Sequence, residues 1–188
     1  MKRSVIVVIS LFVFQICAAP VLNFESRMSR FRSAVDYANK KHHENEFHRL
    51  VQDLGWSESL NNWLCVNCIG CFGEWQFSES TLRFLGYRKI TLRKFRKDPD
   101  IFPRDLQLEA LKGLIKVNMS YLRDYQHFIG DTINNVVITK SGMIAASHLG
   151  GAGSLMKFLR SEGKINREDV LGTSIGDYLR KFSSYELD

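Results

Sequence analysis

The pattern of hydrophobic and polar positions predicts a chain built mainly of α-helices. Apolar residues recur at helical spacing in six segments, which are 24–42, 45–59, 104–122, 139–149, 153–163 and 173–182. Thr139 and Thr173 stand at the start of two of them and are predicted N-caps. The stretch TINNVVIT (132–139) looks extended, as a small hairpin or a single strand would. The expected fold class is mainly α with a minor extended or hairpin segment.

The first nineteen residues have the layout of a secretory signal peptide. Lys2 and Arg3 precede an apolar run that is too short to span a bilayer comfortably, and small residues follow around Ala19. An uncleaved anchor lying in the membrane interface is the alternative. We expect an exported protein, secreted or periplasmic, with no stable membrane insertion after cleavage.

Length and composition fit one domain after that cleavage. Residues 20–44 are expected to form an N-terminal helix, and residues 45–188 one domain with a core of its own. Loss of residues 1–19 removes two basic residues, so the formal net charge falls from +6 to +4. A mildly basic chain weakly favours polyanionic partners such as cell-wall polymers, and a solvated surface is the alternative.

Glu58 is the first candidate for chemistry. It lies four residues after Leu54 and eleven after Phe47, so it falls near the apolar face of its predicted helix. A carboxyl group that is partly shielded from water keeps its proton more readily, as a general acid requires. A Glu that tips into solvent at a helix end is the alternative.

The residues after Glu58 strengthen the catalytic interpretation. Gly70, Gly73 and Gln76 follow at regular spacing, and close glycines indicate a turn where backbone approaches a ligand or a packed helix. Gln76 stands between Trp75 and Phe77 and can present its amide to a polar substrate.

These residues resemble a family signature. The Glu58-Ser59 pair, a loop containing Asn61 and Asn62, and the Gly70, Gly73 and Gln76 segment are similar to the lysozyme-like superfamily of soluble lytic transglycosylases and goose-type lysozymes. A later Ala-Tyr-Asn-Ala-Gly element of that family corresponds here to AASHLGG, which keeps Gly150 but has Ser147 and His148 in place of Tyr and Asn.

The resemblance implies a lysozyme-like catalytic domain over residues 45–188 that cleaves peptidoglycan glycan strands. The bond would be the β-1,4 linkage between N-acetylmuramic acid (MurNAc) and N-acetylglucosamine (GlcNAc), with Glu58 as the general acid and base. No cofactor, metal or nucleic acid is expected, and we expect a monomer. The implied substrate-binding residues are Ser59, Asn62, Gly73, Gln76, Phe77, His148 and Gly150.

The product is left open by the sequence. In a lytic transglycosylase the muramyl 6-hydroxyl attacks the anomeric carbon, whereas in a lysozyme water attacks and a second carboxylate usually assists. Glu74, Glu79 and Asp131 are the carboxylates considered for that role, and a solvated surface position suits each of them better. A single catalytic Glu favours the transglycosylase. A glycan-binding protein without activity is a further alternative, because Ser147 and His148 depart from the pattern.

Two other features have competing interpretations. Cys65, Cys68 and Cys71 form a CxxCxxC run. A disulfide suits an exported chain, most easily from Cys65 to Cys71 or from Cys65 to Cys68, while free thiols and a metal knuckle are alternatives. The stretch RKITLRKFRKDP (88–99) is rich in basic residues and can attract an anionic polymer, although a solvated amphipathic segment is favoured there.

Overall fold

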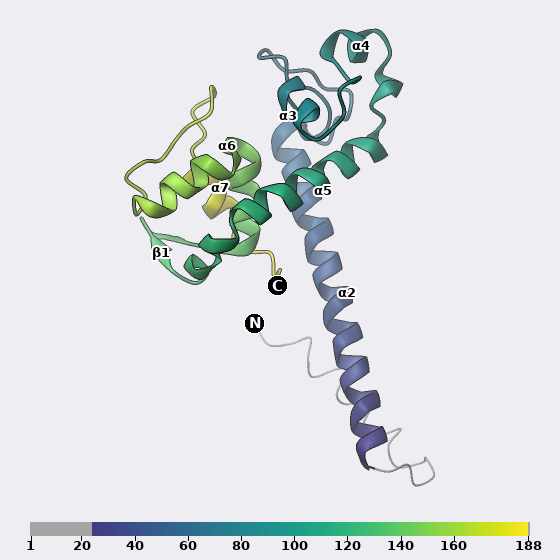
Figure 1. The fold of residues 1–188 in the computed structure, drawn as a ribbon, viewed down its shortest axis with the longest axis vertical. Helices are drawn as coiled ribbons and strands as arrows, with labels where there is room; N and C mark the ends of the chain where they lie inside the picture. Colours follow the sequence, from purple (N-terminus) through teal and green to yellow (C-terminus); the bar gives the residue numbers. More distant parts are fainter. Residues whose placement is uncertain (1–23, 188) are drawn as a thin grey trace. The chain divides into compact units, whose positions relative to one another are not determined.

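The computed structural model describes residues 24–187, so the expected signal peptide lies outside the described residues. It confirms a mainly α protein with one small antiparallel hairpin (Figure 1). The elements in chain order are α2 (Phe24–Ser59), α3 (Glu79–Phe84), α4 (Leu92–Lys97), η1 (Pro99–Ile101), α5 (Arg104–Tyr121), η2 (Arg123–Phe128), β1 (Thr132–Ile133), β2 (Val136–Val137), α6 (Lys140–Arg160) and α7 (Ile175–Lys181).

Helix α2 joins two segments that the sequence pattern predicts separately. The chain divides into two compact units between His42 and His43. In the first unit, residues 24–42 are helical, and Phe31 and Val35 of the predicted apolar stripe are exposed. In the second unit, which the structure describes over residues 43–187, α2 contributes fully buried side chains such as Leu50. The prediction of a helix is therefore correct for both segments, but the predicted apolar face is buried only in the second segment.

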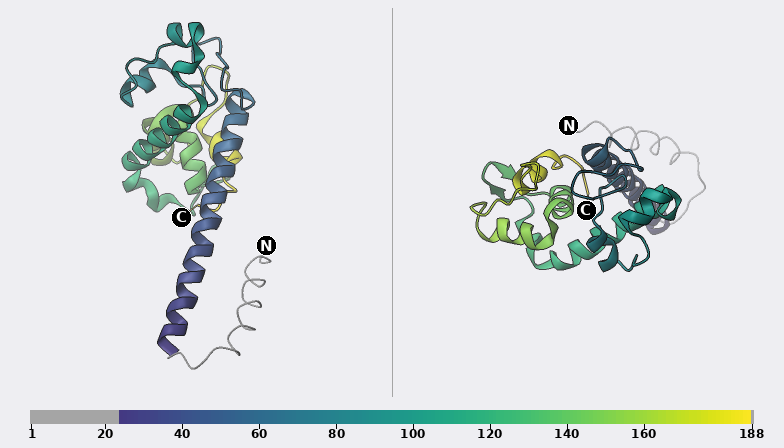
Figure 2. Two further views of the ribbon diagram at one scale, coloured as in Figure 1. Left: turned by 90° about the vertical axis from the view of Figure 1, so that its right-hand side faces the viewer. Right: turned by 90° about the horizontal axis from the view of Figure 1, so that it is seen from above.

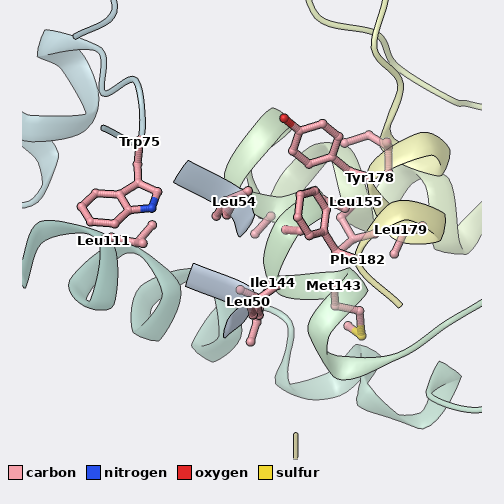
Figure 3. Packing of buried hydrophobic residues seen from close by; sticks show 14 of the residues in the cluster. Leu50, Leu54, Trp75, Leu111, Met143, Ile144, Leu155, Tyr178, Leu179 and Phe182 are labelled. Atoms are coloured by element: carbon pink, nitrogen blue, oxygen red, sulfur yellow. The ribbon is translucent and has the colours of Figure 1, made fainter. Parts of the chain in front are cut away.

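The core of the second unit is a continuous apolar cluster. Figure 3 shows Leu50 and Leu54 of α2 between Trp75 and Leu111 on one side and the residues of α6 and α7 on the other. Side chains of α6 and α7, including Leu179, are fully buried. Burial of large apolar side chains contributes roughly 1.5–3 kcal/mol each, so this cluster is the main source of stability for the unit.

The hairpin and the start of α6 form where the sequence predicts them. Asn134 and Asn135 both have positive φ (49° and 60°), which suits the tight two-residue turn between β1 and β2. Thr139 caps α6, and its Oγ1 accepts a hydrogen bond from the Gly142 N–H. Inside α6 the backbone leaves the helical region at Gly151, so the two predicted helices 139–149 and 153–163 form one kinked element.

The predicted cap of α7 is wrong by one residue. Ser174, not Thr173, is the N-cap, because the Ser174 hydroxyl accepts from the Asp177 N–H while the Asp177 carboxylate accepts from the Ser174 N–H. The Thr173 N–H is engaged by the Asp169 carboxylate instead. A reciprocal capping box satisfies two donors where Thr173 would satisfy one.

The helices of the second unit gather in two groups. Helices α6 and α7 lie side by side, and α3 and α4 lie apart from them near the start of α5 (Figures 1 and 2). Between these groups run residues 43–59 of α2 and helix α5. No helix within residues 24–187 combines the length and the apolar character that a membrane crossing needs.

Removing the N-cap of α7 should weaken the fold and do so in a pH-dependent way. Ser174→Ala is expected to lower the free energy of unfolding by about 1 kcal/mol near neutral pH. Hydrogen bonds from the Ser174 side chain and backbone, with the Arg180 charge, lower the pKa of Asp177. Because the pKa of Asp177 is lower in the folded state than in the unfolded state, its ionised carboxylate stabilises the fold at pH values above the unfolded-state pKa. That contribution is lost as the pH falls through the folded-state pKa.

The loss caused by Ser174→Ala should therefore shrink in acid, below the ordinary pKa of an Asp carboxyl. Urea unfolding across a pH series measures it. Ser120→Ala is the control, because the Ser120 hydroxyl donates to its own helix and is exposed. An unchanged loss at low pH would contradict the role given to Asp177.

Candidate active site

Glu58 lies in the last turn of α2 and lines a cleft of about 440 Å³. Its side chain is 16 % exposed, and Leu54, one turn earlier, is fully buried. The predicted placement of Glu58 beside the apolar face is therefore correct. The carboxylate is partly shielded from water and open to the cleft on one side.

Tyr178 of α7 holds the Glu58 carboxylate. The buried Tyr178 hydroxyl donates to Glu58 Oε1 at 2.7 Å and lies 3.3 Å from the Ser57 hydroxyl. Burial, and then the nearby Glu58 charge, raises the pKa of Tyr178 well above its ordinary value. The phenol therefore stays protonated and remains a donor to Glu58 at any physiological pH.

Sequence reasoning missed Tyr178. It is 120 residues from Glu58 and lies on the apolar face of α7, where a Tyr is normally interpreted as core. Only the packing of α7 beside the end of α2 brings the two together. Lys181, one turn further along α7, donates to Ser57 Oγ at 2.7 Å and also lines the cleft.

His148 of α6 is the third side chain beside Glu58. Its Nε2 donates to the Trp75 carbonyl at 3.0 Å and is 4.0 Å from Glu58 Oε1. Because a carbonyl can only accept, this hydrogen bond places a proton on Nε2. The side chain is 7 % exposed, and no hydrogen-bond partner for Nδ1 is found among the described residues.

Gln76 lies at the end of a tight turn, and its side chain lines the cleft. Phe72 and Phe77 exchange both backbone hydrogen bonds, so residues 73–76 form the loop of a minimal hairpin. Gln76 has a positive φ of 48°, and its Nε2 donates to the Gly73 carbonyl at 2.7 Å. Gln76 Oε1, like His148 Nδ1, is a buried acceptor for which the described residues offer no donor.

Gly73 serves this turn rather than the cleft. Its φ is 87°, and a Cβ atom there would lie 2.6 Å from Oε1 of Gln107. Gln107 occupies that space because its Oε1 accepts from the Glu74 N–H at 2.6 Å, while its Nε2 donates to the carbonyls of Trp63 and Phe102. A side chain at position 73 would break this contact between the turn and α5.

The other residues expected to bind substrate do not line the cleft either. Ser59 Oγ donates to the Glu74 carbonyl at 2.8 Å and accepts from the Asn62 N–H. Ser59 and Asn62 therefore connect the end of α2 to the turn. Phe77 is buried edge-on against His148. At Gly150 a Cβ atom would lie 2.7 Å from the Ile175 side chain, so this glycine allows α6 and α7 to approach. Of the expected residues, Glu58, Gln76 and His148 line the cleft.

The carboxylates that the sequence offered as partners for Glu58 are engaged elsewhere or exposed. Glu74 is fully buried and accepts two hydrogen bonds from Arg104, at 2.5 and 2.9 Å. Glu79 Oε1 accepts from the Leu92 N–H at 2.7 Å. Asp131 is exposed beside the hairpin. Glu74 is thus a structural ion-pair partner and no surface charge.

Asp169 is a cleft carboxylate that sequence reasoning missed. It lies in the loop between α6 and α7 and lines the cleft with Glu58. Its Oδ1 accepts from the N–H groups of Leu171 and Thr173, at 2.9 and 2.8 Å. No motif surrounds it, and the sequence INREDVLGTS reads as an ordinary polar loop.

The cysteines border the same cleft. Cys68 and Cys71 line it, and burial is the main cause that raises the pKa of the Cys71 thiol. All three are free thiols in the structure, so the bridge expected between Cys65 and Cys71 is not formed there. In the part of the chain that the structure describes, no three His, Cys, Asp or Glu side chains are placed to hold one metal ion.

Comparisons of the chain with protein-family models, with curated proteins and with solved structures each found no match. The interpretation of the cleft therefore depends on the residues of this chain and on their geometry.

The Glu74–Arg104 pair should respond asymmetrically to substitution. Arg104→Ala leaves a fully buried carboxylate without its cation and is expected to cost about 3–5 kcal/mol of unfolding free energy. Glu74→Gln removes the buried charge and leaves a guanidinium whose side chain is 58 % exposed, so its loss is expected at about 1–3 kcal/mol.

Denaturant unfolding of both variants tests this asymmetry. Arg123→Ala, an exposed Arg on η2, controls for loss of a surface cation. A larger loss for Glu74→Gln than for Arg104→Ala would contradict the burial-based argument.

Proposed function

We propose that this protein cleaves the β-1,4 bond between MurNAc and GlcNAc in peptidoglycan, with Glu58 as general acid and base. The observation that carries the proposal is the Glu58 carboxylate itself, partly buried in a cleft and held by a Tyr178 hydroxyl at 2.7 Å. A lysozyme-like fold, export to a secreted or periplasmic location, and a monomeric state belong to the same proposal.

The geometry gives Glu58 two distinct oxygens. Oε1 takes the Tyr178 hydrogen bond and the 4.0 Å contact with His148 Nε2. A proton on Oε2 is then the one that a glycosidic oxygen receives when the bond breaks. The carboxylate that remains is stabilised by Tyr178, because a charge-assisted hydrogen bond is stronger than a neutral one. The same carboxylate then removes a proton from the attacking hydroxyl.

The cleft wall is suited to a ligand rich in hydroxyl and amide groups. The side chains of Gln76 and His148 line the cleft, and each has a buried polar atom, Oε1 and Nδ1, that lacks a protein partner among the described residues and lies just behind the cleft wall. Sugar hydroxyls and N-acetyl N–H groups are donors of the required kind. This supports a glycan strand as substrate.

Lytic transglycosylation is the favoured reaction, because one carboxylate has the protected environment of an acid and base. Hydrolysis is the second candidate, and Asp169 favours it. A second carboxylate in the cleft lining can assist the attack of water, as in lysozymes with two acidic groups. A glycan-binding protein without activity is the third candidate, and the first experiment separates it from the enzymes.

The first experiment compares fragments released from purified peptidoglycan by the protein and by Glu58→Gln. We expect 1,6-anhydromuramyl ends that disappear in the variant, because an amide cannot donate and accept the required proton. Mass spectrometry of the soluble fragments measures this. Glu109→Gln is the matched control, since Glu109 is exposed on α5 and does not line the cleft. Equal release by both proteins would rule out Glu58, and binding to sacculi without any release would leave a binding protein.

Tyr178→Phe tests the hydrogen bond in the same assay. Loss of one charge-assisted hydrogen bond is expected to lower kcat by about tenfold to a hundredfold with little effect on KM. Phe retains the ring, so the packing of α7 against α6 is preserved. A normal kcat would mean that Tyr178 only fills space.

Asp169→Asn separates the two products. Asn can accept the same two backbone hydrogen bonds through its Oδ1, so the loop from 169 to 173 should keep its shape. If transglycosylation is the reaction, the yield of anhydro ends should change by less than about threefold. Release of reducing ends by the protein, and their loss in Asp169→Asn, would instead identify a hydrolase with Asp169 as its second carboxylate.

A further inference from the structure

The positive charge of the described chain is concentrated in one short segment. Residues 83–97 carry seven Lys and Arg and no Asp or Glu, whereas the other residues of 24–187 carry 17 Lys and Arg against 19 Asp and Glu. Outside this segment the described chain is therefore slightly acidic. We call residues 83–97 the basic segment, and its cations are Arg83, Arg88, Lys89, Arg93, Lys94, Arg96 and Lys97.

The basic segment is a folded surface with its cations directed outward. All seven cations are exposed, while Ile90 and Phe95 between them are buried. The Phe95 ring packs on Phe72 at 4.9 Å between centroids, and Thr91 caps α4. Because these anchors fix the inner face of α4, its basic side chains must lie on the outer face.

Acidic side chains in the described part of the chain leave the cations of this surface unpaired, and Glu79, which reaches the segment, accepts from the backbone N–H of Leu92. The ion pairs found there involve none of the seven cations. The nearest acid in sequence, Asp98, uses its carboxylate to accept from the Asp100 N–H at the start of η1. Like charges at this density repel one another, so an anion that binds here gains from relieving that repulsion.

We propose that the basic segment binds a flexible linear polyanion with phosphate groups along its backbone. The segment does not line the cleft, so this function is separate from glycan cleavage and does not depend on it. A chain of closely spaced phosphates can follow cations over a convex helix and loop, and each contact releases counterions from the polymer.

Two other anionic partners fit the surface less well. A bilayer is bound best by a helix with an apolar face to bury, and both apolar residues of α4 are engaged by the core, with Phe95 buried and Leu92 partly buried against it. Single-stranded nucleic acid is gripped by several exposed aromatic rings interleaved with cations. In the basic segment Phe84 is exposed, but Phe95 is buried and Tyr87 is half-buried, so one ring offers its face for stacking.

The test measures binding of the full chain to fluorescently labelled inorganic polyphosphate by anisotropy, at about 50 mM and about 200 mM salt. We expect binding that weakens about tenfold or more over that range. The variant Arg93→Gln/Lys94→Gln/Arg96→Gln/Lys97→Gln should weaken binding about tenfold or more at the lower salt concentration, because it removes four phosphate contacts.

The matched control removes the same charge elsewhere. Its four substitutions are Lys112→Gln, Lys116→Gln, Lys157→Gln and Lys164→Gln, all at exposed positions outside the basic segment. This control should bind polyphosphate within about twofold of the unmodified protein, apart from the small effect of net charge. Circular dichroism checks folding. If α4 does not tolerate its substitutions, Arg83→Gln/Arg88→Gln/Lys89→Gln tests the same surface outside α4.

Several outcomes would overturn the proposal. They are absence of polyphosphate binding, equal losses in the basic-segment and control variants, segment-dependent binding to phosphatidylglycerol vesicles without binding to polyphosphate, and much tighter binding to a single-stranded DNA oligonucleotide than to polyphosphate of equal charge. The last two would indicate a membrane surface and a nucleic acid, respectively. Each of these results is independent of whether Glu58 cleaves glycan strands.

Discussion

The candidate site depends on how one four-residue turn satisfies its buried polar groups. The turn at residues 73–76 contains Glu74, whose carboxylate is fully buried and accepts two hydrogen bonds from Arg104 of α5. The backbone of the same turn binds Gln107 of α5 through the Glu74 N–H and Ser59 of α2 through the Glu74 carbonyl. An unpaired charge or amide at this depth would be costly, so the turn holds its partners in fixed positions.

That constraint extends directly to the chemistry of the cleft. The Trp75 carbonyl, one residue along the turn, fixes the proton of His148 on Nε2, 4.0 Å from the Glu58 carboxylate. The indole of Trp75 donates to the Val51 carbonyl of α2, and Gln76 reaches the cleft wall. One turn thus sets the end of α2, the position of the α6 histidine and the wall between them. Glu58 is held from the opposite side by Tyr178, so both sides of its environment are fixed by buried hydrogen bonds.

Local features of the fold could be predicted from the sequence, whereas long-range features could not. Thr139, the Asn134–Asn135 turn and the span of α5 follow from capping, positive φ and helical period, which are properties of neighbouring residues. Glu58 was predicted from its spacing to Leu54 together with the glycine and glutamine segment at 70–76 that follows it. Tyr178 and Asp169 were missed because their role arises from packing more than a hundred residues away, and a Tyr on an apolar helix face has no distinguishing local signal. Glu74 was misjudged for the same reason, since its cation lies thirty residues along the chain.

The distribution of charge explains how one chain can carry both a protected acid and a strongly basic surface. Among the described residues, the cleft lining contains the carboxylates of Glu58, Asp169 and Asp177 and a single Lys or Arg, Lys181, which donates to Ser57 Oγ. A dense group of cations beside Glu58 would favour its ionised form and oppose its use as an acid. The basic segment instead lies on α3, α4 and the loop between them, outside the cleft lining. The proposed polyanion site and the proposed acid are therefore built from different residues of the chain.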